Sequence, residues 1–160
     1  MTERNCLRLD FSAKHRVARL ESVFQSIVVA AAIVDDLSKP TQVLAAQRSY
    51  PAQWRGFYEF PGGKTEPGET PEQALRRELR EELSAEIIVG ERLEDTWPAH
   101  GGFQMFVYLC TLAPHSEAQA GEAHLSLRWV DLKHSESLPW LPADYPILTA
   151  IAQHYGITQD

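Results

Sequence analysis

The spacing of apolar and polar residues divides most of the chain into short segments with two different periods. Several segments are continuously apolar or alternate, as buried strands do, and two repeat their apolar residues every three or four positions, as helices do. The predicted order is strand 23–34, strand 42–48, short strand 57–60, helix 71–83, strands 86–97, 103–112 and 126–131, and helix 145–155. Strands interleaved with two helices predict an α/β fold in which helices flank a mixed β-sheet.

The helix predicted at 71–83 has a clear start and an apolar stripe. Thr70 suits the N-cap position, and Gln73 three residues later completes a capping box. Pro71 falls at the first helical position, where its missing N–H costs nothing. The stripe that faces the core recurs every four residues, at Leu75, Leu79 and Leu83.

The same helix carries three glutamates on or beside one face. Glu78 and Glu82 are one turn apart, and Glu81 lies on the flank of that face. Like charges at this spacing destabilise a helix by ~0.2–0.5 kcal/mol per pair. A divalent cation with oxygen ligands, Mg²⁺ or Mn²⁺, would compensate that repulsion. The helix alone is more typical of a solvated surface helix of mixed charge.

The segment before the helix favours the metal site. Phe60-Pro61-Gly62-Gly63 is followed by Glu66-Pro67-Gly68-Glu69, which predicts a glycine-hinged turn that leads into the helix. Adjacent glycines let the backbone come close to a ligand. The carbonyl groups of Gly62 and Gly63 are therefore expected to face the same cation as the glutamates.

Residues 63–85 resemble the signature of the Nudix hydrolases. Gly63 and Glu69 stand at the spacing of that signature before Arg77-Glu78-Leu79 and Glu81-Glu82. Ser84 replaces a glycine that usually ends the helix in a left-handed conformation, so the helix end is where this chain departs from the pattern. The resemblance covers roughly residues 23–153 and implies a Nudix α/β/α sandwich over 21–160, after an extension at 1–20.

The resemblance also implies roles for the residues of the signature. Glu78 and Glu82 would hold Mg²⁺ (or Mn²⁺), Glu81 would share a second ion, and the carbonyl of Gly62 or Gly63 would complete the inner shell. A metal-bound water would attack phosphorus in line. Glu69 and Arg77 match a pair in which the arginine positions a carboxylate near the metal, and a structural salt bridge at the loop–helix junction is the alternative.

The substrate contacts are predicted from outside the signature. Arg48 and Lys64 would contact phosphate, or are ordinary surface cations. The base pocket would draw on Phe103, Met105 and Tyr145, with Asp144 as its polar anchor, and the alternative for Asp144 is the N-cap of the last helix. An ionised carboxylate accepts from an exocyclic amine, which favours cytosine-like bases, and an oxidised guanine is also possible.

The loop before the last strand lacks an expected carboxylate. Relatives carry one six residues before the tryptophan that matches Trp129, and this chain has Ala123 there. We expect the neighbouring Glu122 to act as the catalytic base, unless the base lies elsewhere. Glu59 is a candidate outer-shell ligand, although an acidic residue at such a place is more often solvated.

The segment from Leu141 to Leu148 resembles the MutT-like branch that hydrolyses pyrimidine nucleoside triphosphates and their oxidised or methylated variants. The implied products are a nucleoside monophosphate and pyrophosphate. Alternatives are an 8-oxo-dGTP diphosphatase, although such members tend to carry asparagine in place of Asp144, and an ADP-ribose or nucleotide-sugar pyrophosphatase. A nucleotide-binding module without catalysis is a further alternative, which the three glutamates disfavour.

Composition limits the setting in which this chemistry takes place. A net charge of −7 argues against binding to a nucleic acid polymer. The longest apolar run, 27–34, is too short to span a membrane. Two cysteines give no disulfide framework, so a reducing cytoplasm is expected, with the protein as a monomer or homodimer. Residues 1–20 are basic, lack a secretory signal and predict either a loose tail or an ordered dimer contact.

Overall fold

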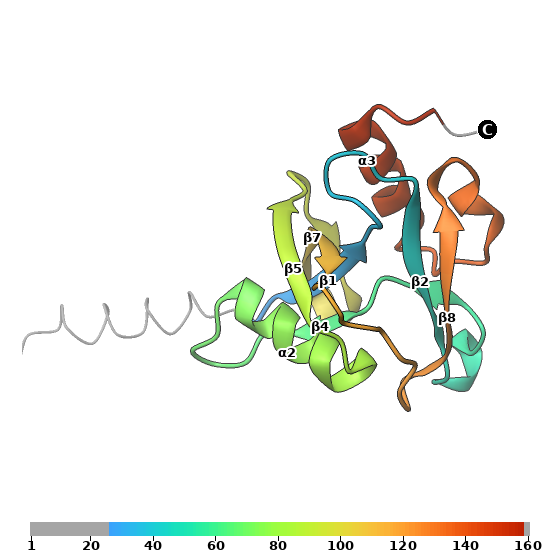
Figure 1. Ribbon diagram of the computed structural model, residues 1–160. Helices are drawn as coiled ribbons and strands as arrows, with labels where there is room; N and C mark the ends of the chain where they lie inside the picture. Colours follow the sequence, from blue (N-terminus) through green and yellow to red (C-terminus); the bar gives the residue numbers. More distant parts are fainter. Residues whose placement is uncertain (1–25, 159–160) are drawn as a thin grey trace, which may run out of the picture.

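Two β-sheets and the helices that cover them make up residues 26–158, the part of the chain that this computed structural model describes (Figure 1). Helix α2 (Pro71–Leu83) covers one side of the sheets, and helix α3 (Tyr145–Tyr155) covers the other. The strands are β1 (Val28–Ile33), β2 (Gln42–Arg48), β3 (Tyr58–Glu59), β4 (Gly62–Lys64), β5 (Ile87–Arg92), β6 (Trp97–Pro98), β7 (Gln104–Leu112) and β8 (His124–Asp131). This layering confirms the predicted α/β/α sandwich.

The larger sheet is mixed, as predicted. Its strand order is β4-β1-β7-β5, and β6 also pairs with β7. Strands β1 and β7 run parallel, whereas β4 is antiparallel to β1 and β5 is antiparallel to β7. The smaller sheet, β3-β2-β8, is antiparallel throughout. Within residues 26–158 the strands thus form two sheets rather than one, connected by a bridge between Val34 and Val43.

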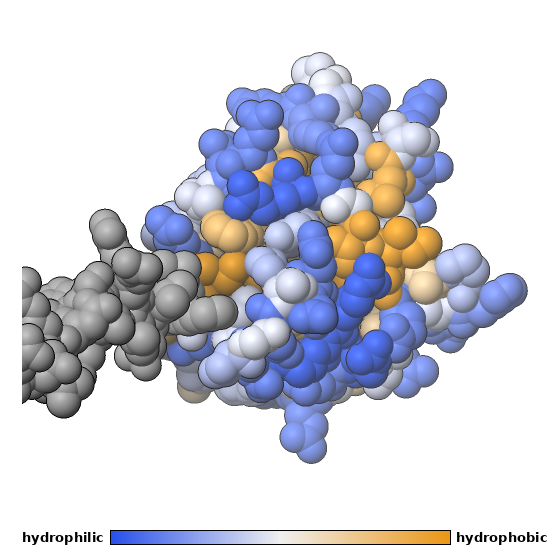
Figure 2. All heavy atoms as spheres, turned by 90° about the vertical axis from the view of Figure 1, so that its left-hand side faces the viewer, coloured by the Kyte–Doolittle hydropathy of each residue, from blue (hydrophilic) through white to orange (hydrophobic). Residues whose placement is uncertain are grey.

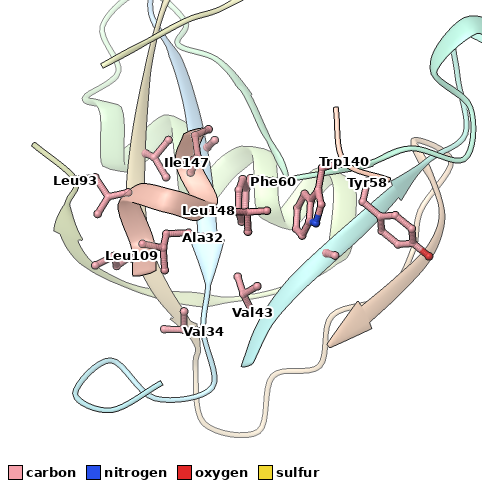
Figure 3. Packing of buried hydrophobic residues seen from close by; sticks show 14 of the residues in the cluster. Ala32, Val34, Val43, Tyr58, Phe60, Leu93, Leu109, Trp140, Ile147 and Leu148 are labelled. Atoms are coloured by element: carbon pink, nitrogen blue, oxygen red, sulfur yellow. The ribbon is translucent and has the colours of Figure 1, made fainter. Parts of the chain in front are cut away.

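Strand β1 is buried on both faces, which explains its uninterrupted apolar sequence. Val29, Ala31 and Ile33 pack in one hydrophobic cluster with the apolar stripe of α2. The alternate residues, beginning with Ala30, belong to a second cluster that includes Ile147 of α3. Figure 3 shows this second cluster, where side chains from α3 and from both sheets meet. The two helices therefore pack on opposite faces of β1, each in its own hydrophobic cluster.

Helix α2 begins and ends where the sequence predicts. The Thr70 hydroxyl accepts from the N–H of Gln73, and the Gln73 side chain accepts from the N–H of Thr70, so the capping box is present. Ser84 follows the helix in the left-handed region, with φ of 51°. Its N–H donates to the carbonyl of Arg80 at 3.1 Å. The serine thus adopts the conformation that glycine usually supplies at a helix end.

Some predicted strands have different bounds in the structure. The strand predicted at 86–97 is interrupted, because β5 ends at Arg92, Leu93 turns into the core, and β6 begins at Trp97. Strand β4, where the glycine pair predicted a turn, forms because Gly62 and its neighbours pair with β1. Strand β8 begins at His124, before the predicted start at 126.

The first predicted strand is described only in part. Its residues 23–25, the extension 1–20 and the domain start at 21 lie outside the described residues. Among those described, no helix has the length and apolar character needed to cross a bilayer. Cys110 is fully buried in β7, and burial raises the pKa of its thiol to about 12, so it is a core residue without thiolate character. The face in Figure 2 is mostly hydrophilic, with a few apolar patches.

Candidate active site

Strand β4 lies against the glutamate-bearing face of α2. A Cβ atom on Gly63 would lie 2.4 Å from the Cδ atom of Glu78, closer than real Cβ contacts come. Glycine therefore lets the Glu78 carboxylate rest on the β4 backbone. A Cβ atom on Gly62 would instead lie 1.9 Å from the carbonyl oxygen of Val29 on the paired strand β1. The two predicted glycines thus serve different contacts, one with the glutamate and one with the sheet.

Glu82 lies on the same helix face in a largely buried environment. Burial is the main cause that raises the pKa of Glu82 to about 7. The carboxylates of Glu78 and Glu59 raise this pKa further, whereas a charge on His124 lowers it. The Oε2 atom of Glu82 is buried and has no hydrogen-bond partner in the described part of the chain. A buried acceptor of this kind is costly unless a donor or a cation satisfies it.

Arg77 connects the loop before α2 with the glutamates on the helix. Its Nε and Nη2 atoms donate to the two carboxylate oxygens of Glu69 at 2.6 and 3.0 Å. Its Nη1 atom donates to Glu78 at 2.9 Å and to Glu81 at 3.4 Å, and Nη2 also donates to the carbonyl of Lys64 at 3.0 Å. The hydrogen bond from Arg77 is the main cause that lowers the pKa of Glu69. The same guanidinium therefore makes the loop–helix salt bridge and holds Glu78.

The donor set fits Mg²⁺ through two glutamates rather than three. Within residues 26–158, no three His, Cys, Asp or Glu side chains converge around one point that would hold an ion. The side chain of Glu81 is 61% exposed and contacts Arg77. Mg²⁺ in proteins is usually bound through one or two carboxylates and keeps several waters. The unsatisfied oxygen of Glu82 and the Glu78 carboxylate supply oxygen donors of that kind.

A second polar network enters the site from the smaller sheet. One carboxylate oxygen of Glu59 on β3 pairs with Arg48 of β2, and the other lies 2.9 Å from Nε2 of His124 on β8. The His124 side chain is fully buried, and its Nδ1 atom has no hydrogen-bond partner among the described residues. A register shift between Gln47 and Arg48 brings Arg48 opposite His124. Glu59 is therefore fixed from two sides, and the solvated alternative is wrong.

A cavity of about 740 Å³ joins these networks, a volume typical of small-molecule sites. The predicted site residues that line it are Arg48, Gly62, Gly63, Lys64, Met105 and Asp144. The rest of its wall comes from Glu59 and Phe60 and from segments around residues 51–54, 98–100 and 141–143. One cavity is thus lined by Gly63, which contacts Glu78, by two cations and by a buried acid.

Asp144 faces this cavity and does not cap helix α3 with its side chain. It is 5% exposed, and its Oδ2 atom has no hydrogen-bond partner in the described chain. Burial is the main cause that raises the pKa of Asp144 to about 8, and the charge of Glu59 raises it further. Asp144 does occupy the N-cap position of α3, as the alternative interpretation predicts, but only its backbone carbonyl takes part in the helix. A pKa of about 8 favours the protonated carboxyl group at neutral pH.

The predicted substrate contacts Phe103 and Tyr145 and the predicted base Glu122 do not line the cavity. The ring of Phe103 packs against the ammonium group of Lys64, 4.4 Å from the ring centroid. The hydroxyl of Tyr145 donates to the carbonyl of Leu138 at 3.2 Å, and the side chain is 36% exposed. Glu122 is exposed on its loop, and its backbone carbonyl accepts from the hydroxyl of Ser49. Of the predicted apolar pocket, the structure brings Met105 to the cavity.

Two residues that the sequence did not single out belong to the site. His124 lies beneath Glu59, and Trp54 lines the cavity from a short 3-10 turn, η1 (Ala52–Trp54). Neither residue has a local signal, because its position depends on how β2, β3 and β8 pair. The one indication in the sequence that His124 belongs to the site was its position directly after Glu122 and Ala123.

Comparisons with known proteins agree with this geometry. The family model of the NUDIX domain matches residues 26–151. The CTP pyrophosphohydrolase of Escherichia coli (strain K12) is 38% identical over 125 residues, which cover 78% of this chain and 90% of that protein. A putative 8-oxo-dGTP diphosphatase 2 of Mycobacterium tuberculosis is 38% identical over 125 residues, which cover 76% of this chain and 84% of that protein.

Solved structures show the same likeness. The solution structure of the E. coli ORF135 protein has a TM-score of 0.64 and 37% identity, and the match covers 80% of this chain and 89% of that one. A structure from a study of MutT from Aliivibrio salmonicida and Vibrio cholerae has a TM-score of 0.57 and 28% identity, with 80% and 98% covered. With residues 26–151 matched by the family model and a relative 38% identical over most of its length, the chain belongs to the Nudix hydrolase family.

Proposed function

We propose that this Nudix hydrolase converts nucleoside triphosphates of the cytidine type, or oxidised and modified deoxynucleoside triphosphates, into a nucleoside monophosphate and pyrophosphate. Such a reaction serves nucleotide-pool sanitation. The observation that carries the proposal is the single cavity that places Arg48 and Lys64 together with the buried acid Asp144, next to the glycine–glutamate contact. The names of the relatives in E. coli and M. tuberculosis support the same substrate class.

The polyphosphate end of the substrate is assigned to β4 and α2. Glu78 and Glu82 would hold Mg²⁺, with Mn²⁺ as an alternative, and Arg77 keeps Glu78 in position at 2.9 Å. When bound there, the cation supplies neutralising charge to the phosphate oxygens and lowers the pKa of a water. Arg48 and Lys64 line the same cavity and are placed to contact phosphate. Without cations, the carboxylates of this face would repel a polyanion.

The proton acceptor is assigned to the loop that follows β7. The N–H of Gly121 donates to the carbonyl of Glu82 at 3.2 Å, so this loop touches the end of α2. Glu122 follows directly and is the carboxylate nearest in sequence to Ala123. General-base catalysis contributes about 10²- to 10⁴-fold. A loss of that size in kcat for Glu122→Gln supports this assignment, and unchanged kcat moves the base to another residue.

The base end of the substrate is assigned to Asp144. A protonated carboxyl group offers one O–H donor and one carbonyl acceptor. This pair matches the cytosine edge, where N3 accepts and the exocyclic amine donates. With a pKa of about 8, Asp144 carries that proton at neutral pH, so its preference for cytosine does not depend on being ionised.

A second candidate function is hydrolysis of 8-oxo-dGTP. A protonated Asp144 also matches a keto oxygen beside a ring N–H, which an oxidised guanine presents. The M. tuberculosis relative bears the name of this activity. The protonated form of Asp144 is therefore compatible with both substrates, whereas an ionised carboxylate would disfavour a base that presents a keto group.

The test is a screen of pyrophosphate release over normal, oxidised and methylated nucleoside triphosphates, with ADP-ribose included. Wild-type protein with Mg²⁺ is compared with Glu82→Gln, which keeps the size of the side chain and removes its charge. We expect turnover of a cytidine-type or modified triphosphate, with pyrophosphate rather than phosphate released, and a loss of at least about 100-fold in the variant. Turnover of ADP-ribose alone would overturn the proposed substrate class.

A further inference from the structure

Trp54 is a large aromatic residue whose place at the cavity is not explained by the core. Among the four tryptophans of the sequence, Trp97 and Trp140 are buried in the cluster on the α3 side. Trp54 is half-buried, lines the cavity and belongs to neither of the two hydrophobic clusters of the described residues. Its indole N–H has no hydrogen-bond partner within residues 26–158, whereas that of Trp140 donates to Ser135 at 2.7 Å.

The segment that carries Trp54 is held in one conformation by its own hydrogen bonds. The N–H of Trp54 donates to the carbonyl of Pro51 at 2.9 Å, and the N–H of Phe57 donates to the carbonyl of Trp54 at 3.1 Å. The ring of Phe57 packs edge-on against that of Trp54, with centroids 5.4 Å apart and planes at 87°. The N–H of Gly56 donates to the carbonyl of Arg48 at 2.9 Å, which ties the segment to β2. A ring fixed in this way loses little freedom when a ligand binds.

The same segment is connected to the charged part of the site. The Nε atom of Arg48 donates to the carbonyl of Tyr50 at 3.1 Å, and its Nη1 atom pairs with Glu59. Arg48, Trp54 and Asp144 therefore line one cavity from three separate elements. They supply a cation, a flat aromatic face and a polar edge contact, which are the groups that recognise a nucleotide.

We propose that Trp54 is a specificity-determining residue of this site, whose indole ring stacks on the nucleobase while Asp144 contacts the edge of that base. The proposal rests on the proposed function, because it takes a nucleoside triphosphate as the ligand. Stacking recognises the face of any base, and the edge contact then distinguishes one base from another. Removal of the ring therefore weakens the binding of every nucleotide and leaves the binding of a ligand without a base unchanged.

The experiment measures binding rather than turnover. Dissociation constants for a non-hydrolysable CTP analogue with a methylene group between the α- and β-phosphates, and for inorganic tripolyphosphate, are measured by calorimetry with Mg²⁺ present. The proteins are wild type, Trp54→Ala, Trp54→Phe and the control Trp129→Ala, which removes a tryptophan that is 38% exposed and does not line the cavity. Thermal unfolding of each variant establishes that it is folded.

We expect Trp54→Ala to raise the dissociation constant of the CTP analogue about 5- to 150-fold and to leave that of tripolyphosphate unchanged. Trp54→Phe restores part of the loss, and Trp129→Ala has no effect. Equal weakening of both ligands would overturn the stacking role and assign Trp54 to support of Arg48. Unchanged binding of the analogue would overturn it as well. If wild-type protein binds tripolyphosphate but no nucleoside triphosphate, the proposed function has failed, and the stacking role fails with it.

Discussion

Arg77 and Glu69 form a two-point ion pair across the junction between the β4–α2 loop and α2, with N···O distances of 2.6 and 3.0 Å. The pair is only partly exposed, and the remaining nitrogen of the guanidinium donates to Glu78. A planar fork is needed for this arrangement, because one side chain must address two carboxylates and a carbonyl at once. The junction and the candidate metal ligand are therefore positioned by the same group.

Arg77→Lys is expected to lower kcat about 10- to 100-fold while most of the folding stability is kept, because lysine retains the charge and loses the fork. The matched control is Arg80→Lys. Arg80 forms the same kind of two-point pair with Glu86, at 2.6 and 3.0 Å, on the exposed surface of α2. Steady-state kinetics and urea unfolding are measured for both variants. Equal loss of activity in the two would show that the effect belongs to helix stability.

Substitution of either glycine of β4 by alanine is expected to affect a different property of the protein. In Gly63→Ala the new methyl group meets the flexible end of Glu78, so the carboxylate swings aside, the protein stays folded and affinity for Mn²⁺ drops at least about 10-fold. In Gly62→Ala the methyl group meets the rigid backbone of β1, so the free energy of unfolding falls by about 2 kcal/mol or more. Metal titration and chemical denaturation separate the two results. Similar unfolding midpoints for both variants would contradict this assignment.

Ser84→Gly is expected to stabilise the protein by about 1 kcal/mol, because the left-handed conformation at φ of 51° is strained for serine and free for glycine. The side chain is exposed, so little contact is lost. Denaturant midpoints and kcat are measured together, and kcat should not change. Ser84→Ala serves as the control and should not stabilise. A gain in both variants would place the effect in the serine side chain rather than in the backbone.

Asp144 predicts a pH-dependent difference in stability. Its pKa is about 8 in the folded protein and near 3.8 when exposed, so the folded state keeps a proton that the unfolded state releases. Its contribution to stability is therefore lost as the pH rises from about 4 to about 8, and is constant above that range. Asp144→Asn resembles the protonated form and should match wild type at pH 4. At pH 8.5 it should be more stable by on the order of 5 kcal/mol.

Urea unfolding in metal-free buffer at both pH values measures this difference. The charged groups nearest to Asp144, those of Glu59 and Arg48, are present in wild type and variant alike, so the comparison isolates the change at Asp144. Glu82, whose pKa is also raised, is present in both proteins, so its contribution to the stability difference cancels. If the difference in stability between Asp144→Asn and wild type is the same at pH 4 and pH 8.5, burial does not keep Asp144 protonated in the folded protein.

The sequence was informative where a local pattern determines the outcome. Helix α2 follows from the cap at Thr70 and the leucine stripe, and the pairing of Arg77 with Glu69 follows from the family pattern. The left-handed conformation of Ser84 was not predicted, because serine stands where the pattern usually has glycine, and the structure nevertheless keeps that conformation.

The rest of the site depends on contacts between distant segments. Two glycines in sequence predict a turn, and only pairing with β1 makes β4 a strand. The protonation of Asp144 follows from its burial, which no local pattern reveals. Trp54 and His124 reach the site through the pairing of the smaller sheet, so neither has a signal of its own. The side chain of Glu81 is 61% exposed, which spacing along the helix alone does not reveal.

The placement of α2 and α3 on opposite sides of the sheets separates two kinds of evolutionary change. In the proposed function, phosphate chemistry depends on one helix, and recognition of the base depends on the residue at the start of the other. Substitutions around Asp144 can therefore redirect the enzyme to another nucleotide without disturbing bond cleavage. A lineage with this architecture can diversify its substrates while its reaction stays constant.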